Sequence, residues 1–142
     1  MMSPRSNLER LRSLDIAWNE RRWSDYGAIL SDRMIAFVSG EAEAHGKSIH
    51  VSRAKAFCRS FPDACVHIDP YVQVFANPDG SRTCTVARLT GTAAANPSLQ
   101  FDITFSVVCI WQDGRIINQH QFVDDSLLDR QLGRNWIAQV TH

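Results

Sequence analysis

The sequence contains no run of apolar residues long enough to span a bilayer, and no signal-peptide pattern follows Met1. We therefore expect a cytoplasmic protein with no membrane partner. The sequence also has no Cys-x-x-Cys pair, and its cysteines are not grouped with histidines in the manner of a zinc site. Free thiols, rather than disulfides or metal ligands, are expected at Cys58, Cys65, Cys84 and Cys109.

An excess of either charge is missing as well. The 142 residues include 15 basic and 15 acidic side chains, so the formal net charge is zero. Nucleic-acid-binding domains usually carry a basic field that captures phosphates, so we expect no nucleic-acid partner. There is also no Ser-His-Asp signature, glycine-rich phosphate loop or His-x-Glu pattern. Metal and nucleotide chemistry are therefore disfavoured, and no cofactor is expected.

Hydrophobic residues make up 44% of the chain, which is typical of a globular protein, and without repeats or linkers residues 1–142 are expected to form one domain. The first half predicts helices. A capping box, Ser6 with Glu9, precedes apolar residues at helical spacing, which predicts a helix from Ser6 to Trp23. Further elements are predicted in this half: a helix over Asp25 to Leu30, a strand over Met34 to Val38 and a helix over Ser52 to Phe61.

The second half predicts strands, because polar and apolar residues alternate there between turn signals. The predicted strands are Val66 to Phe75, Thr83 to Thr92, Leu99 to Trp111 and Arg115 to Asp124. A helical segment from Asp125 to Leu132 follows, and Gly133 is placed to end it. Helices followed by one antiparallel meander indicate an α+β fold. We expect a curved antiparallel sheet packed on the amino-terminal helices, with a cone-shaped interior that can hold a small ligand.

Four stretches, in this order, resemble the SnoaL-like polyketide cyclase family of the nuclear-transport-factor-2-like cone-fold superfamily. They are AWNERRWSDYGAIL (Ala17 to Leu30), FPD (Phe61 to Asp63), ARLTGT (Ala87 to Thr92) and WQDGRIINQHQFVDDSLLDRQLG (Trp111 to Gly133). The resemblance implies a conical α+β barrel, a homodimer, and a deep pocket with neither metal nor organic cofactor. Characterised members close the ring of a polyketide ester by intramolecular aldol chemistry.

The resemblance also implies a catalytic residue. The family's acid–base aspartate ends the last strand, and the motif match places it on Asp124. This chain departs from the family at two positions. His120 stands four residues before the aspartate, where members commonly carry tryptophan, and Ala93 follows the Gly-Thr pair, where many carry histidine. The first departure changes the chemistry of the pocket, and the second removes a polar partner.

Strict alternation along the last strand would put Asn118, His120, Phe122 and Asp124 on one face. If this face lines the cone, a carboxylate with a pKa raised by desolvation could abstract a proton next to a carbonyl. The imidazole or the amide could then donate to the enolate oxygen. Each residue also has an alternative role. Asp124 could cap the following helix, His120 could be a core or interface histidine, and Asn118 could be an ordinary strand residue.

Four other residues are candidates for substrate binding. Arg88 could hold a substrate carboxylate, although an ion pair with Asp63 or Asp69 would explain it equally well. Aromatic side chains at Trp18, Tyr26 and Trp111 could line the pocket or belong to the core.

The function predicted from these observations is that of a cyclase or isomerase, or a related lyase, in which acid–base proton transfer takes place next to a carbonyl. The expected partner is a small apolar carbonyl compound, and a polyketide-like structure is one candidate for it. A non-catalytic ligand-binding module and a hydrolase or dehydratase remain as alternatives. Homodimerisation is expected through the outer face of the sheet, on the parity of Gln119, Gln121 and Val123. The segment from Arg134 to His142 could close the pocket or contact a partner.

Overall fold

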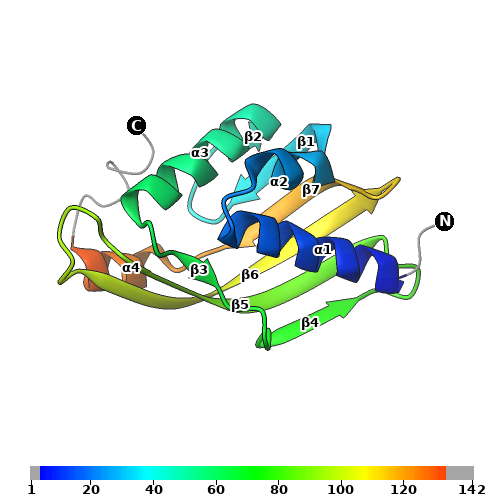
Figure 1. The fold of residues 1–142 in the computed structure, drawn as a ribbon. Coiled ribbons are helices and arrows are strands. Elements are labelled where there is room, and N and C mark those ends of the chain that lie inside the picture. Colours follow the sequence, from blue (N-terminus) through cyan, green and yellow to red (C-terminus); the bar gives the residue numbers. More distant parts are fainter. Residues whose placement is uncertain (1–3, 134–142) are drawn as a thin grey trace.

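The computed structural model describes residues 4–133, and the segment from Arg134 to His142 lies outside this range (Figure 1). The helices are α1 (Pro4–Asn19), α2 (Trp23–Ile29), α3 (Lys47–Ser60) and α4 (Asp125–Leu132). The strands are β1 (Leu30–Val38), β2 (His45–Gly46), β3 (Cys65–Val66), β4 (Gln73–Ala76), β5 (Arg82–Thr92), β6 (Gln100–Gln112) and β7 (Arg115–Phe122). Among residues 4–133, no helix combines the length and the apolar character needed to cross a membrane.

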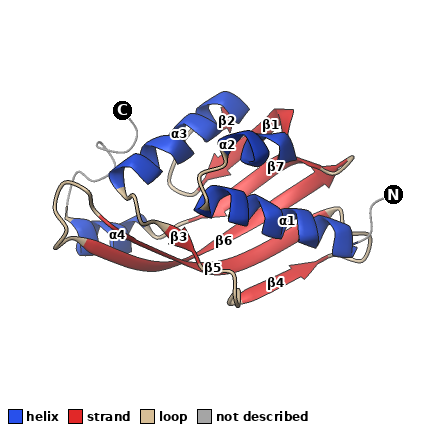
Figure 2. Ribbon diagram, in the orientation of Figure 1, coloured by secondary structure: helices blue, strands red, loops and turns tan. Residues whose placement is uncertain are grey.

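The strands form one curved sheet in the order β2-β1-β7-β6-β5-β3, with β4 paired to β5. The predicted meander is present in β5, β6 and β7, which are long and antiparallel. β1 joins this meander through a parallel pairing with β7. Helices α1, α2 and α3 cover one face of the sheet, and α4 closes one end (Figure 2). We call the face away from these helices the outer face.

Two of the predicted helices differ from the structure by more than two residues at one end. The first predicted helix is divided, because α1 ends at Asn19 and α2 begins at Trp23. Arg21 between them has a φ of 61°, which a continuing α-helix does not allow. The third helix begins at Lys47 rather than Ser52. His50 therefore lies on a helix, although it precedes the predicted one.

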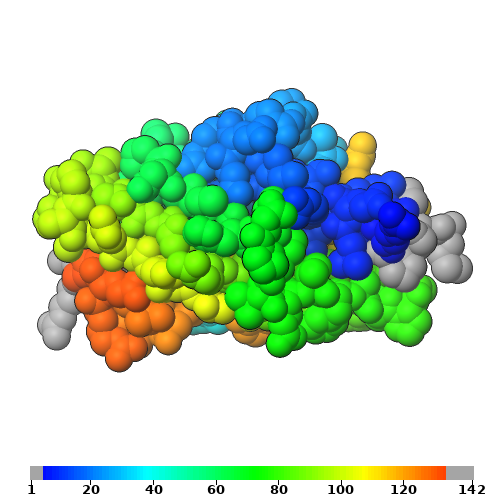
Figure 3. Space-filling model, turned by 60° about the horizontal axis from the view of Figure 1, so that its bottom comes forward, coloured from blue at the N-terminus to red at the C-terminus, as the bar shows by residue number. Residues whose placement is uncertain are grey.

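The strand predicted from Val66 to Phe75 is interrupted. It is present as β3 and β4, with Pro70 in the gap between them. Proline has no backbone N–H to donate to a strand partner, which accounts for the interruption. In the space-filling view, the segment that contains β3 and β4 (green) lies directly beside α1 (blue) (Figure 3).

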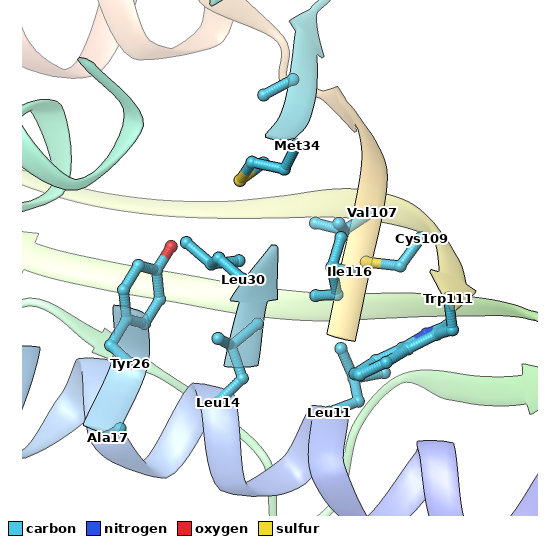
Figure 4. Close-up of a cluster of buried hydrophobic side chains, with 11 residues drawn as sticks. Leu11, Leu14, Ala17, Tyr26, Leu30, Met34, Val107, Cys109, Trp111 and Ile116 are labelled. Carbon is cyan, nitrogen blue, oxygen red and sulfur yellow. The ribbon is translucent and has the colours of Figure 1, made fainter. Parts of the chain in front are cut away.

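Apolar side chains from α1 and α2 pack against the inner face of β1, β6 and β7 (Figure 4). Leu11 and Leu14 of α1 contribute to this core, opposite Val107 and Ile116 of the sheet. A second buried cluster forms where α4 packs near β6, around Phe101 and Leu128. The four cysteines are free, as predicted.

Candidate active site

A cavity of about 310 Å³ lies between the helices and the inner face of the sheet, and most of its lining is apolar. We call it the cone cavity. One face of α1 forms part of its wall. The residues on this face are Leu11, Leu14, Asp15 and Trp18. The polar residues that line it are Asp15, Tyr26, Glu41, His45, His50, Arg53, Thr85, Gln119, Gln121 and Asp125.

A β-bulge in β7 decides which residues of that strand reach the cavity. Ile116 is paired with Trp111 of β6, whereas Asn118 is paired with the next β6 residue, Ile110. Ile117 is therefore an extra residue on β7, and the alternation of faces shifts by one after it. Ile116 points into the core, but beyond the bulge the inward set is Gln119, Gln121 and Val123.

The predicted orientation of the last strand was therefore wrong. The parity of Asn118, His120 and Phe122 lies on the outer face, and these residues do not line the cone cavity. The His120 ring lies 4.6 Å from the Phe37 ring, centroid to centroid, and Phe122 is exposed. The parity of Gln119, Gln121 and Val123, which was assigned to a dimer interface, instead faces the cavity.

Asp124 is also outside the cavity lining. It is the exposed N-cap of α4, and its Oδ1 accepts a hydrogen bond from the backbone N–H of Leu127 at 3.0 Å. The capping role is thus present in the structure. No observation tests a catalytic role for this carboxylate, which stays a prediction. Its neighbour Asp125 is the residue that lines the cavity.

The other predicted binding residues divide into two groups. Trp18 and Tyr26 line the cone cavity, as their positions suggested, and a binding role for them stays a prediction. Trp111 is buried in the core, where its Nε1–H donates to Thr83 Oγ1 at 2.9 Å. Arg88 forms an exposed ion pair with Asp102 at 2.7 Å rather than with Asp63 or Asp69. Neither Trp111 nor Arg88 reaches the cavity.

Asp15 of α1 places a carboxylate in the apolar wall. The Tyr71 hydroxyl donates to its Oδ2 at 2.6 Å. Burial raises the pKa of Asp15 from 3.8 to about 6, although the bond from Tyr71 acts in the opposite direction. A carboxyl group with such a pKa is mostly ionised at neutral pH and is still basic enough to accept a proton.

Tyr26, His45, His50 and Arg53 form a connected chain along one wall. Tyr26 Oη lies 3.1 Å from His50 Nε2, and His50 Nδ1 lies 2.9 Å from His45 Nε2. Arg53 Nη1 lies 3.3 Å from His45 Nδ1 and donates to Glu41 Oε1 at 2.7 Å. Burial lowers the pKa of both histidines, to about 4 for His50, so both imidazoles are neutral at pH 7.

The remaining polar groups come from the start of α4 and from the sheet. Burial, reinforced by neighbouring carboxylates that include Glu41, raises the pKa of Asp125. Gly40, with a φ of 85°, gives this carboxylate room, since a Cβ there would lie 3.2 Å from Asp125 Oδ2. On β7, the 3% exposed Gln119 has a buried Oε1 without a hydrogen-bond partner in the described part of the chain. Such an amide is available to a ligand.

Sequence reasoning did not identify Asp15, His45, His50, Arg53, Gln119 or Asp125 as site residues. One signal was present for Asp15, which follows Leu11 by four residues and precedes Trp18 by three. A carboxylate at an apolar position of an amphipathic helix suggests a buried functional group. The histidines gave no comparable signal, because neither His45 nor His50 lay within a predicted helix or strand. Gln119 was assigned to the outer face of the sheet, and Asp125 was predicted only as the first residue of the last helical segment.

The site thus combines a carboxylate base, a phenol and a buried amide within an apolar enclosure. Such a set can accept a proton from carbon and donate hydrogen bonds to an oxygen that gains negative charge. Within residues 4–133, no three His, Cys, Asp or Glu side chains are grouped as metal ligands.

Residues 9–132 match the family model described as SnoaL-like polyketide cyclase. Several solved structures have the same fold. AclR from Streptomyces galilaeus, a candidate hydroxylase, is 15% identical with a TM-score of 0.80, over 93% of this chain and 83% of AclR. A candidate polyketide cyclase from Pseudomonas putida is 18% identical with a TM-score of 0.77, over 93% and 99% of the two chains.

An LEH-like epoxide hydrolase from M. tuberculosis is 16% identical with a TM-score of 0.72, over 95% of each chain. At these identities the likeness concerns the fold, which hosts several activities. A comparison with curated proteins finds no match.

Proposed function

The chain belongs to the SnoaL-like polyketide cyclase family, and on that premise we propose that its cone cavity catalyses proton transfer next to a carbonyl group. The substrate class is a small, largely apolar carbonyl compound. The overall reaction would be a ring closure of the aldol type or an isomerisation. Asp15, rather than Asp124, is the proposed base.

The observation that carries this proposal is the Asp15 carboxylate in the apolar wall. Its pKa of about 6 places it near the value at which a general base works best at neutral pH. Asp125 is a second carboxylate on the lining, but it lies next to Glu41 and the start of α4. Asp15 extends from α1 among Leu11, Leu14 and Trp18, where an apolar substrate would be enclosed.

The proposed step is balanced without an added reagent. The C–H bond next to the carbonyl breaks, its proton moves to an Asp15 carboxylate oxygen, and its electron pair forms the enolate. In a ring closure the enolate carbon attacks a second carbonyl carbon of the same molecule. The alkoxide that forms then takes this proton from Asp15, which regenerates the carboxylate. Positioned acid–base catalysis contributes about 10²- to 10⁴-fold, which suits a C–H already acidified by two carbonyls.

The test is solvent-deuterium exchange into a panel of cyclic and aromatic β-keto esters and β-diketones, followed by NMR. Wild-type protein would be compared with Asp15→Asn, Asp124→Asn and Asp125→Asn. We expect wild type and Asp124→Asn to exchange at similar rates, and Asp15→Asn to be about 10²- to 10⁴-fold slower. Exchange retained in Asp15→Asn but lost in Asp125→Asn or Asp124→Asn would overturn the assignment of the base.

Absence of exchange by wild type, together with binding of panel members, would contradict the catalytic proposal. It would instead favour the alternative of a ligand-binding module. A hydrolase would be recognised by incorporation of labelled solvent oxygen into product, which carbon–carbon ring closure does not produce.

A further inference from the structure

The chain of Tyr26, His50, His45 and Arg53 connects the interior of the cone cavity to its mouth. Tyr26 is 5% exposed, whereas the Arg53 side chain is 37% exposed and paired with Glu41. The three contacts that join the four residues lie between 2.9 and 3.3 Å, and every member lines the cavity. The partly exposed guanidinium of Arg53 can therefore influence the hydrogen bonding of the buried Tyr26 hydroxyl through the two histidines.

Chemistry at one end fixes the direction of the hydrogen bonds. A guanidinium has only N–H donors and remains charged, so Arg53 donates and His45 Nδ1 accepts. His45 then carries its hydrogen on Nε2 and donates it to His50 Nδ1. His50 likewise carries its hydrogen on Nε2 and donates it to the Tyr26 oxygen. The two hydrogens of Arg53 Nη1 suffice for both of its acceptors, His45 and Glu41.

Protonation of either imidazole would break this chain. A protonated His45 would direct an Nδ1–H at the Arg53 guanidinium, so two donors would face each other. A protonated His50 would need His45 Nε2 as an acceptor, which would move the His45 hydrogen to Nδ1 with the same result. The electrostatics agree, because burial lowers the pKa of both histidines and the positive charge of Arg53 lowers each further.

The Tyr26 oxygen therefore accepts from His50, and its own hydrogen is left for another acceptor. We propose that Arg53, His45 and His50 are positioning residues that commit the Tyr26 hydroxyl hydrogen to the cone cavity, where it donates to the oxyanion of a bound enolate or phenolate. A hydroxyl that accepts a hydrogen bond is polarised and donates more strongly. The enolate as the natural ligand rests on the proposed function, whereas oxyanion binding can be measured without turnover.

The location of Tyr26 relative to Asp15 suits this role. The charge of Asp15 is among the causes that raise the pKa of Tyr26, so the two groups are within electrostatic reach. When Asp15 accepts a proton it becomes neutral, and the negative charge appears on the substrate oxygen. Tyr26 stays protonated and can donate to that oxygen at the moment the charge develops.

The first test measures oxyanion binding in the Asp15→Asn protein, whose neutral amide stands for the carboxylic acid present after proton abstraction. The probes are a substituted phenol acidic enough to bind as phenolate and its methyl ether, which has no charge. We expect a further Tyr26→Phe change to weaken phenolate binding by about 10- to 100-fold and to leave ether binding unchanged. Unchanged phenolate affinity would overturn the proposal, and ether affinity shows that the cavity remains folded.

The second test addresses the positioning residues by nitrogen NMR of the imidazoles in the wild-type protein. We expect both His45 and His50 to carry hydrogen on Nε2 and none on Nδ1. Arg53→Gln removes the donor-only group and should allow the opposite tautomers, with phenolate affinity falling several-fold. Arg53→Lys keeps a donor-only cation and is the matched control. An Nδ1–H on either wild-type histidine, or equal phenolate affinity in the Gln and Lys variants, would overturn the chain.

The two proposals can fail separately. Phenolate binding that depends on Tyr26 and Arg53, without deuterium exchange by wild type, would leave the chain intact and refute proton transfer. Exchange that depends on Asp15, with phenolate binding insensitive to Tyr26 and Arg53, would do the reverse.

Discussion

The burial that suits Asp15 to its proposed role as a base also lowers the stability of the folded protein at neutral pH. In the folded protein its pKa is about 6, compared with 3.8 for an ordinary aspartate. Below the lower pKa the carboxyl is protonated and neutral in both the folded and the unfolded state, so its burial carries no penalty for a buried charge. As pH rises to the upper value, the unfolded state ionises first, so the folded state loses stability.

We therefore expect Asp15→Asn to be more stable than wild type above pH 6. The gain in the free energy of unfolding should be about 1–3 kcal/mol near pH 7.5 and should disappear near pH 4. Urea unfolding at both pH values measures it. An equal effect of the substitution at the two pH values would show that Asp15 has an ordinary pKa in the folded protein.

The same carboxyl sets the expected pH dependence of proton transfer. Only the ionised form of Asp15 can accept a proton, so the rate of deuterium exchange should rise with pH and level off above about pH 6 to 7. Rates measured across this range on a single panel substrate give the profile. A rate that falls with rising pH would indicate a protonated group as the essential one.

At the scale of the element, the start of α4 separates two carboxylates that are adjacent in sequence. Asp124 caps the helix, and Asp125 lines the cone cavity. Asparagine caps helices about as well as aspartate, whereas alanine does not. Substitutions at Asp124 can thus distinguish a capping role from a catalytic one.

We expect Asp124→Ala to lower the free energy of unfolding by about 1 kcal/mol and Asp124→Asn to change it by only a few tenths. Chemical denaturation of the two variants provides the comparison. Equal stability of the Ala variant and wild type would mean that the hydrogen bond to the Leu127 N–H contributes little to stability.

At the scale of the whole molecule, acidic side chains outnumber basic ones in the lining of the cone cavity. Its lining includes the carboxyl groups of Asp15, Glu41 and Asp125 and one guanidinium, that of Arg53. These acidic groups would repel a substrate carboxylate. We expect methyl esters from the panel to bind at least about 10-fold more tightly than the corresponding free acids at neutral pH, by calorimetric titration. Tighter binding of the acids would show that Arg53 dominates.

The outer face of the sheet is the place where we expect two copies to pair. Ile35, Phe37 and Phe122 are 40–50% exposed there, and a cluster of exposed apolar side chains commonly marks an interface. Light scattering should show a dimer at micromolar concentration, and Phe122→Glu should convert it to a monomer. Val74→Glu, at an exposed position of β4, is the control. A monomeric wild type would contradict this expectation.

The sequence predicted the fold well where the signals are local. Strands β5, β6 and β7 follow the predicted ranges within a few residues, because alternation and tight turns such as Asp113-Gly114 are readable in a short window. The family resemblance supplied the cone. The site was less predictable, because the bulge at Ile117 depends on pairing with β6, which no window of β7 contains. The contacts of His45 and His50 likewise form only when β2 and α3 meet.

The bulge in β7 also bears on how this protein can evolve. Insertion or loss of one codon at this position would exchange the two sides of the strand beyond it. The groups that face a ligand would become groups that face another molecule, and the reverse. If relatives were aligned without a gap at this position, identical residues in the alignment could lie on opposite faces of the sheet. A change of chemistry in this strand could thus arise in one mutational step, without substitution of any side chain that carries it.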